Sequence, residues 1–405
     1  MPVFYGVRAQ FITTVFVQCK TIWKHNFTAS PYSRNIQLCN PQPATLAYTS
    51  TFIFTINFFE NFFMNAASNL LCVLLAGLTG SILITSCGQG SAGSEPATAD
   101  SSKTKAGNTS TPTVLDTADY NRRMLAIANN DTTGKWPAKN ALPLPGAILP
   151  YNRVIAYYGN LYSKRMGILG EIPKDSMFAR LLAEVKNWQA ADSTTKTIPA
   201  LHYVAVTAQG APGKDGKHRL RMPGHQIDTI INWARQINAL AFVDVQVGHS
   251  TVKDEMPPLE SFLSQPDVHL GIDPEFSMKK GERPGSKIGT FDAADINDAI
   301  DFLASVVQKY KLTPKILVVH RFTQGMMTNY QNIKSVPEVQ VVIDMDGFGD
   351  KILKRSTYLR YVYKEPVQFT GFKLFYKNDS KNTTGLYTPE ELLKFTPKPI
   401  YIQYQ

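Results

Sequence analysis

The chain has 405 residues, 43% of them hydrophobic, and a formal net charge of +10. Its basic residues are spread along the sequence, and the densest basic stretch, Lys214–Arg221, is interrupted by Gly and Asp. This pattern is typical of solvated loop charge and argues against a nucleic-acid partner. No Cys/His spacing typical of a zinc site is present, so our primary interpretation includes no metal and no cofactor.

The sequence of the first 150 residues predicts an N-terminal leader, a flexible tether and a short helix that precede the main domain. Residues 1–63 are rich in Phe, Thr and Asn and have no clean helical or strand period. We interpret Met64 as the true start and residues 1–63 as a spurious N-terminal extension. An apolar stretch, Leu70–Ile84, follows and ends just before Cys87. It is about 15 residues long, which is short of the roughly 20 needed to span a membrane.

The residues around Cys87, ITSC, resemble a bacterial lipobox. The resemblance implies that residues 64–86 are a signal peptide and that Cys87 carries the lipid. The protein would then be held in the cell envelope, either in the periplasm or on the outer surface. Residues 88–113 are rich in Gly, Ser, Ala and Thr, which is typical of a flexible tether. Residues 117–129 show helical spacing within the segment 87–150 that leads to the main domain.

The domain at 151–405 shows a regular alternation of apolar runs and helical patterns. Eight short apolar runs end in polar or glycine-bearing residues: 154–159, 202–210, 241–248, 270–276, 316–322, 339–349, 371–377 and 399–404. Between them lie seven helical patterns: 177–190, 227–238, 258–264, 294–310, 329–335, 350–360 and 389–395. The clearest covers 294–310, with Asp292 or Ala293 as its expected cap.

This alternation predicts a parallel (β/α)8 TIM barrel, because the length from residue 153 to residue 405 fits the roughly 250 residues typical of that fold. The eighth helix is missing, since the sequence stops at the eighth run. We expect residues 117–129 to fill that gap or to cover the bottom of the barrel. A doubly wound sheet is disfavoured because no GxGxxG follows the first run.

In such barrels the active site lies at the C-terminal ends of the strands. Those ends and the loops after them carry polar and aromatic residues, which suit sugar hydroxyls and pyranose faces. The candidates for binding substrate are Tyr157, Tyr158, Gln209, Gln246, His320, Arg321, Asp344, Phe348, Lys373, Tyr376 and Gln403. His320 is equally consistent with a structural histidine, and Lys373 either pairs with Asp344 or Asp346 or contacts substrate.

The catalytic candidates are Glu275, Asp273, Asp346 and Asp244. Asp273 and Glu275 leave the fourth strand together, where packing alone explains them poorly. We assign Glu275 as the general acid, because its apolar neighbours Pro274 and Phe276 are expected to raise its pKa. Asp346 or Asp244 would be the second carboxylate. Asp244 is also consistent with a polar residue held in a network inside the barrel.

The motif DPE at 273–275 resembles the strand-four proton donor of a large clan of barrel glycoside hydrolases. That clan also has a glutamate nucleophile at the end of strand seven, where this chain has no carboxylate. The acids in IDMDG at 343–347 loosely resemble those of chitinase- and muramidase-like barrels. The whole of 153–405, opened by IAYYG at 155–159, resembles uncharacterised bacterial lipoproteins with a hydrolase-like barrel.

Three functions remain open at this point. The first is a glycoside hydrolase or related enzyme acting on a carbohydrate or a cell-envelope glycan. The second is a barrel that binds such glycans without catalysis, which the missing strand-seven carboxylate favours. The third is a metal-dependent hydrolase using Asp273, Glu275, His320 and Asp346, since carboxylates with imidazole suit divalent cations.

Overall fold

The computed structural model describes residues 114–381 and 384–405. The predicted N-terminal extension, the signal peptide, the lipidation of Cys87 and the tether lie outside these residues. Within them, no helix is long and apolar enough to cross a membrane.

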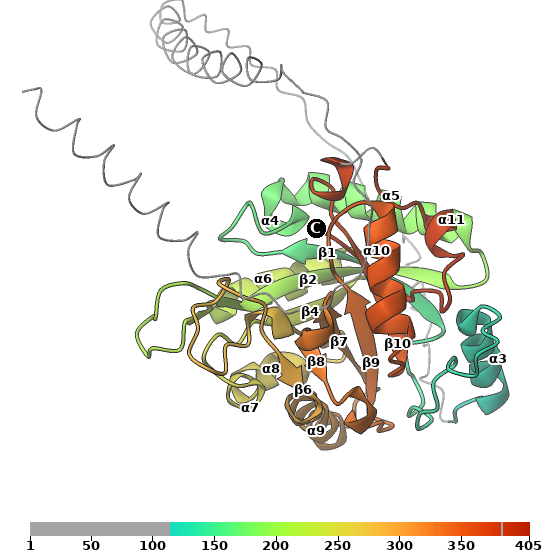
Figure 1. The fold of residues 1–405 in the computed structure, drawn as a ribbon, viewed down its shortest axis with the longest axis horizontal. Coiled ribbons are helices and arrows are strands. Elements are labelled where there is room, and N and C mark those ends of the chain that lie inside the picture. Colours follow the sequence, from blue (N-terminus) through green and yellow to red (C-terminus); the bar gives the residue numbers. More distant parts are fainter. Residues whose placement is uncertain (1–113, 382–383) are drawn as a thin grey trace, which may run out of the picture. The chain divides into compact units, whose positions relative to one another are not determined.

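Eight parallel strands close into a barrel, as the alternation of apolar runs predicted (Figure 1). Around the barrel the order is β1, β11, β10, β9, β7, β5, β4 and β2, and β2 pairs with β1 to close the ring. The strands are β1 (Asn152–Gly159), β2 (Lys196–Ala208), β4 (Leu240–Val245), β5 (Val268–Ile272), β7 (Lys315–Arg321), β9 (Val339–Met345), β10 (Phe369–Leu374) and β11 (Tyr401–Tyr404).

Helices surround the strands and bury their apolar faces on them (Figure 1). They are α3 (Thr117–Ala128), α4 (Ile168–Glu171), α5 (Lys174–Ala191), α6 (Gly224–Gln236), α7 (Val252–Glu255), α8 (Glu260–Leu263), α9 (Ala293–Tyr310), α10 (Lys351–Thr357) and α11 (Pro389–Leu392). In the described part of the chain, no helix follows β11. Three short strands lie in the loops: β3 (Arg219–Arg221) is antiparallel to β2, and β6 (Phe291–Asp292) pairs with β8 (Met327–Thr328).

Local sequence explains the best-predicted helix, α9. The Asp292 side chain caps the helix, and the Asp295 carboxylate accepts a hydrogen bond from the Asp292 backbone N–H, which completes a capping box. The helix predicted at 329–335 is wrong, because only a 3-10 turn, Tyr330–Asn332, forms there. The Asn297 side chain of α9 instead binds the Asn332 carbonyl and the Lys334 N–H, so these backbone groups are satisfied without a helix.

The helix α3 covers the bottom of the barrel, which is one of the two places predicted for it. Its buried residues Tyr120, Met124 and Ile127 belong to the same apolar cluster as interior residues such as Phe242 and Phe369. The chain between α3 and β1 is fastened there by Gln340, a buried residue near the start of β9. Its amide accepts from Leu149 N and donates to Leu149 O, at 3.1 and 2.6 Å.

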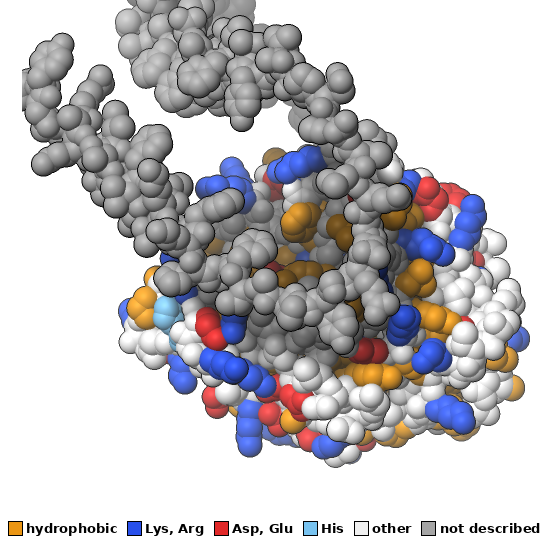
Figure 2. Space-filling model, viewed as in Figure 1, with side chains coloured by type: hydrophobic (Ala, Val, Ile, Leu, Met, Phe, Trp, Pro, Cys, Tyr) orange, Lys and Arg blue, Asp and Glu red, His pale blue; other side chains and the backbone are white. Residues whose placement is uncertain are grey.

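Basic side chains are dispersed on the part of the surface that Figure 2 leaves uncovered. Lys and Arg alternate there with Asp and Glu, and no continuous basic stripe forms. The basic residues are therefore as dispersed on this part of the surface as they are along the sequence.

Candidate functional site

The upper half of the barrel interior is polar. Each strand alternates between a helix-facing and an interior-facing side chain. The interior-facing residues in this half are nearly all buried and contact one another: Tyr158, His202, Asp244, Gln246, Asp273, His320, Asp344, Asp346, Lys373 and Gln403. The C-terminal strand ends therefore converge on one polar centre, as expected for this fold.

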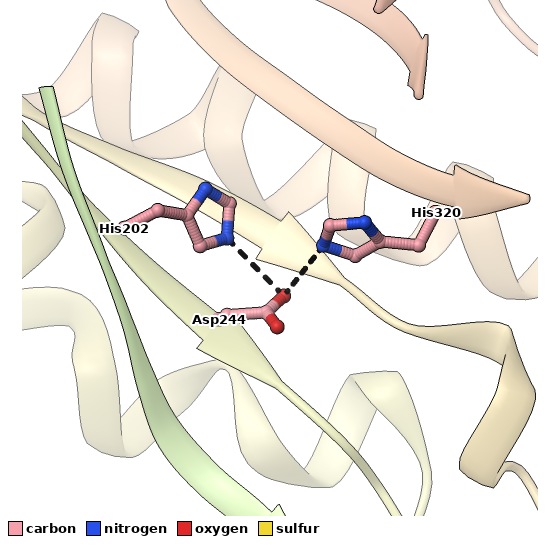
Figure 3. Close-up of side chains that lie close together, drawn as sticks. All are labelled: His202, Asp244 and His320. Carbon is pink, nitrogen blue, oxygen red and sulfur yellow. Dashed lines mark ion pairs between the residues drawn. The ribbon is translucent and has the colours of Figure 1, made fainter. Parts of the chain in front are cut away.

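The deepest contacts of this centre involve two histidines and one aspartate (Figure 3). His202 Nε2 lies 3.6 Å and His320 Nε2 lies 3.7 Å from the same oxygen, Oδ1 of Asp244. The other Asp244 oxygen accepts a hydrogen bond of 3.2 Å from the Tyr158 hydroxyl. All three residues of the cluster are fully buried. Asp244 thus belongs to an interior network, which is one of its two predicted roles.

His320 connects this deep cluster with two further carboxylates. Its Nδ1 atom lies 3.3 Å from Asp344 Oδ2 and 3.4 Å from Asp346 Oδ2. Burial alone would lower the pKa of His320, but the carboxylates around it, Asp244 first, raise that pKa well above its ordinary value. The pKa of His202 is lowered by burial, against the opposing effect of Asp244.

A cavity of about 640 Å³ opens above this layer. Asp273, Glu275, Asp346, Lys373 and Tyr158 line it, together with Gln246. The Lys373 ammonium lies 3.9 Å from Asp346 Oδ2 and 3.8 Å from the centroid of the Tyr158 ring. Lys373 therefore both pairs with Asp346 and faces the cavity, so the two predicted readings of this residue are compatible.

The two carboxylates of the DPE motif have different surroundings. Asp273 Oδ1 accepts from the Glu275 backbone N–H at 3.0 Å, which caps the 3-10 turn Pro274–Phe276, and Oδ2 accepts from Gln246 at 3.3 Å. Burial raises the pKa of Asp273 well above its ordinary value. Burial and then the charge of Asp346 raise the pKa of Glu275 to about 7. A carboxyl group of this kind can hold a proton near neutral pH.

Aromatic rings form part of the cavity wall. Phe276, Phe322, Phe348 and Phe375 all line it. Phe348 is 63% exposed and packs edge-on against Phe375, with ring centroids 5.9 Å apart. Apolar rings beside carboxylates are the surface that a sugar ring needs for stacking and hydroxyl recognition.

Four of the predicted substrate-binding residues lie away from the cavity. Tyr157 and Tyr376 face the helices and approach each other through their hydroxyls at 2.9 Å, near Glu184 of α5. Arg321 also faces outward, pairs with Glu365 at 2.7 Å and donates to the backbone carbonyls of Thr323 and Tyr361. Gln209 lies in the loop after β2, where its backbone N–H binds the His218 carbonyl. The sequence analysis named neighbours such as Tyr157 and Tyr158 together, and adjacent residues of a strand face opposite sides, so only one of each such pair can reach the interior.

Four other predicted residues lie beneath the cavity rather than in its wall: the catalytic candidate Asp244 and the binding candidates His320, Asp344 and Gln403. Asp344 is fully buried against His320. Gln403 is also buried, and its amide donates to the Tyr401 hydroxyl at 2.9 Å.

Sequence reasoning missed His202 and a buried ion pair. His202 stands at the start of an apolar run on β2 that is buried on both faces, so no alternation of polar and apolar residues marks its interior position. Lys354 and Asp379 form a fully buried pair at 2.8 Å. Lys354 lies in α10, within the helical pattern at 350–360, and Asp379 lies in a polar segment after β10, so no pattern in the sequence joins them.

No family model matches the chain. No curated protein matches it either. Solved structures with which it shares weak similarity include the YdhT protein from Bacillus subtilis, with a TM-score of 0.37, 11% identity, and coverage of 73% of this chain and 87% of that one. A Bacillus subtilis mannanase gives a TM-score of 0.35, 9% identity, and coverage of 73% and 86%. A dihydropteroate synthase from Burkholderia cenocepacia gives a TM-score of 0.29 and 11% identity. The match covers 63% of this chain and 86% of that one.

Proposed function

We propose that this protein is a hydrolase of glycosidic bonds, with Glu275 as its general acid and Asp346 as the second carboxylate. The observation that carries the proposal is that Glu275 and Asp346 line one cavity whose wall also contains Phe348 and Phe375. Burial and the charge of Asp346 raise the pKa of Glu275 to about 7, which suits a proton donor near neutral pH. A pair of carboxylates at one cavity, one of them a proton donor, is the arrangement that hydrolysis of a glycoside requires.

The roles of the two carboxylates follow from their surroundings. Glu275 donates its proton to the glycosidic oxygen as the bond to the anomeric carbon breaks. Burial raises the pKa of Asp346, and the two basic groups beside it, His320 at 3.4 Å and Lys373 at 3.9 Å, oppose that rise and favour its ionised form. An ionised Asp346 either activates water or attacks the anomeric carbon. Phe348 and Phe375 stack on sugar rings, and Tyr158 and Lys373 contact hydroxyls.

The setting that we propose for this activity is the cell envelope, with the chain anchored through a lipid on Cys87. The lipobox-like ITSC ending at Cys87 and the tether-like composition that follows support it. N-terminal sequencing and mass spectrometry of the native protein test this. A mature N-terminus at a lipid-modified Cys87 is expected, and any peptide from residues 1–63 would contradict the interpretation of Met64 as the start.

The experiment for the reaction compares the purified protein with its Glu275→Gln variant on soluble polysaccharides and peptidoglycan. Reducing-end release and glycan binding are recorded on the same samples. Release by the wild type that is lost in the variant, with binding retained, is the expected result. If both proteins bind glycan and neither releases reducing ends, the proposal of a hydrolase fails and the protein is a glycan-binding barrel without catalysis. The end of β10, which carries Lys373 and no carboxylate, is the observation that favours this second function.

A further inference from the structure

We propose that His202, Asp244 and His320 bind one divalent first-row transition-metal ion inside the barrel, beneath the glycan cavity. These residues come from β2, β4 and β7, and none of them lines the cavity above. This site is separate from the carboxylates to which the hydrolase reaction is assigned. It also differs from the metal site considered from the sequence, which lacked His202 and Asp244.

The first argument is geometric. One donor atom from each of the three residues lies within 4.8 Å of the other two (Figure 3). The measured separations to Asp244 Oδ1 are 3.6 Å from His202 Nε2 and 3.7 Å from His320 Nε2. Two ligands bound at about 2.0–2.2 Å to one ion at near-tetrahedral or wider angles are roughly 3.3–3.7 Å apart. Both separations are too long for good hydrogen bonds and suit two ligands of a shared ion.

The second argument is that the same atoms lack partners. His202 Nε2, Asp244 Oδ1 and His320 Nε2 are buried and make no hydrogen bond in the described part of the chain. A buried polar atom without a partner costs free energy, and most such atoms in native proteins are satisfied. Three of them turned toward one point indicate a ligand that accepts lone pairs from all three.

The outer contacts of the histidines fit this assignment. His202 Nδ1 lies 2.6 Å from the Tyr401 hydroxyl, which also accepts from the Gln403 amide. His320 Nδ1 lies 3.3 Å from Asp344 Oδ2 and 3.4 Å from Asp346 Oδ2, close to both carboxylates but without a completed hydrogen bond to either. Metal-bound histidines commonly use their second ring nitrogen in this way, with a carboxylate or another oxygen fixing the ring.

Space and charge at this position agree as well. A Cβ on Gly271 of β5 would lie only 2.5 Å from both Asp244 Oδ1 and His202 Nε2, so a glycine there leaves the approach to these two donors open. Four aspartate side chains are buried in this part of the barrel: Asp244, Asp273, Asp344 and Asp346. The positive charge of Lys373 lies beside one of them, Asp346. A divalent cation would offset this concentration of buried carboxylates.

The donor set selects the class of ion. Two imidazole nitrogens and one carboxylate oxygen suit Zn²⁺, Co²⁺ or Fe²⁺ better than Mg²⁺ or Ca²⁺, which prefer oxygen ligands. Zn²⁺ and Co²⁺ are the two probes for the test, since Co²⁺ reports its coordination through visible absorption.

The test uses the purified untagged protein after treatment with a chelator. Zn²⁺ is titrated calorimetrically, and Co²⁺ is followed by its visible spectrum. One equivalent is expected to bind, with intense Co²⁺ bands typical of four- or five-coordination and a rise in melting temperature. Asp244→Asn and His202→Ala are expected to lower the affinity at least 100-fold, with circular dichroism confirming that each variant folds.

The matched control is His249→Ala. His249 and His218 have ring centroids 4.2 Å apart near the surface, so this pair could capture a metal adventitiously. The control is expected to bind one equivalent as tightly as the wild type. The proposal is overturned if the wild type binds no equivalent of either ion below about 10 μM, or if His249→Ala loses the binding while Asp244→Asn keeps it.

Discussion

His320 Nδ1 lies 3.4 Å from Asp346 Oδ2, and this contact joins the buried centre of the barrel to the wall of the cavity. Burial raises the pKa of Asp346, while His320 and Lys373 act in the opposite direction. Glu275 faces the same cavity, and burial and the charge of Asp346 raise its pKa to about 7. An ionised Asp346 thus helps to keep Glu275 protonated. This coupling gives two acidic side chains in one cavity different roles.

The raised pKa of Glu275 predicts a specific pH dependence of stability. The folded protein holds a proton that an unfolded chain, with the ordinary value of 4.5, has released. The stabilisation is fully present below about pH 4.5 and is lost as the pH rises through about 7. Over that range the wild type should lose up to about 3 kcal/mol in free energy of unfolding relative to Glu275→Gln. Urea denaturation at a series of pH values measures this difference.

The control for that series is Glu390→Gln, which alters an exposed glutamate on α11. Its stability profile between pH 4.5 and 8 should run parallel to that of the wild type. Parallel profiles for Glu275→Gln and the wild type would show that Glu275 is ionised throughout, and the assignment of a general acid would then fail.

Two adjacent tyrosines of β1 predict opposite outcomes. Tyr158 lines the cavity and donates to Asp244, so Tyr158→Phe should weaken glycan turnover or binding. Tyr157 faces the helices and meets Tyr376, so Tyr157→Phe should cost only about 1 kcal/mol of stability and leave glycan affinity unchanged. Calorimetric glycan titration with thermal melts distinguishes the two. Loss of affinity in Tyr157→Phe alone would contradict the placement of Tyr158, rather than Tyr157, in the cavity wall.

The barrel could be predicted from the sequence because the pattern of one apolar run followed by one helical segment is repeated along the domain. Eight apolar runs alternate with helical patterns, and each repeat constrains the same architecture. The cluster of Asp273, Glu275 and Asp346 at the cavity could also be predicted, because carboxylates at the ends of buried strands are conspicuous and the fold says where those ends meet.

The face of each side chain could not be predicted in the same way. Strands of a parallel barrel are buried on both sides, so the run VIAYYG offers no hydrophobic contrast to separate Tyr157 from Tyr158. His202 was hidden for the same reason within an apolar run. The pairing of Lys354 with Asp379 depends on how α10 packs against the segment after β10, and the local sequence pattern carries no information on that contact.

Gly271 predicts a steric limit in the polar centre. A Cβ at this position would lie 2.5 Å from Asp244 Oδ1 and from His202 Nε2, both of which are held by a packed interior. Gly271→Ala should therefore cost about 1–3 kcal/mol of stability or more, because neighbouring groups must move. Gly325→Ala is the matched control, since a Cβ there meets nothing within 4 Å. Chemical denaturation that finds equal stability for the two variants would contradict this tight packing.

The buried pair of Lys354 and Asp379 predicts a strong dependence of the cavity rim on one ion pair. Lys354 Nζ lies 2.8 Å from Asp379 Oδ2 and also donates to the carbonyls of Gly347 and Lys373, at the ends of β9 and β10. Removing one partner leaves the other charge buried, so Lys354→Met should cost about 3–5 kcal/mol.

The matched comparison is Lys351→Met, one turn earlier on α10. Lys351 pairs with Glu391 at a similar distance, 2.7 Å, but both side chains are partly exposed. Water screens such a pair, and its loss should cost no more than about 1 kcal/mol. Urea denaturation of the two variants measures the contrast. A similarly small loss of unfolding free energy in both variants would mean that the loops carrying Phe348 and Phe375 hold their positions without the buried ion pair. Apolar packing alone would then shape this side of the cavity.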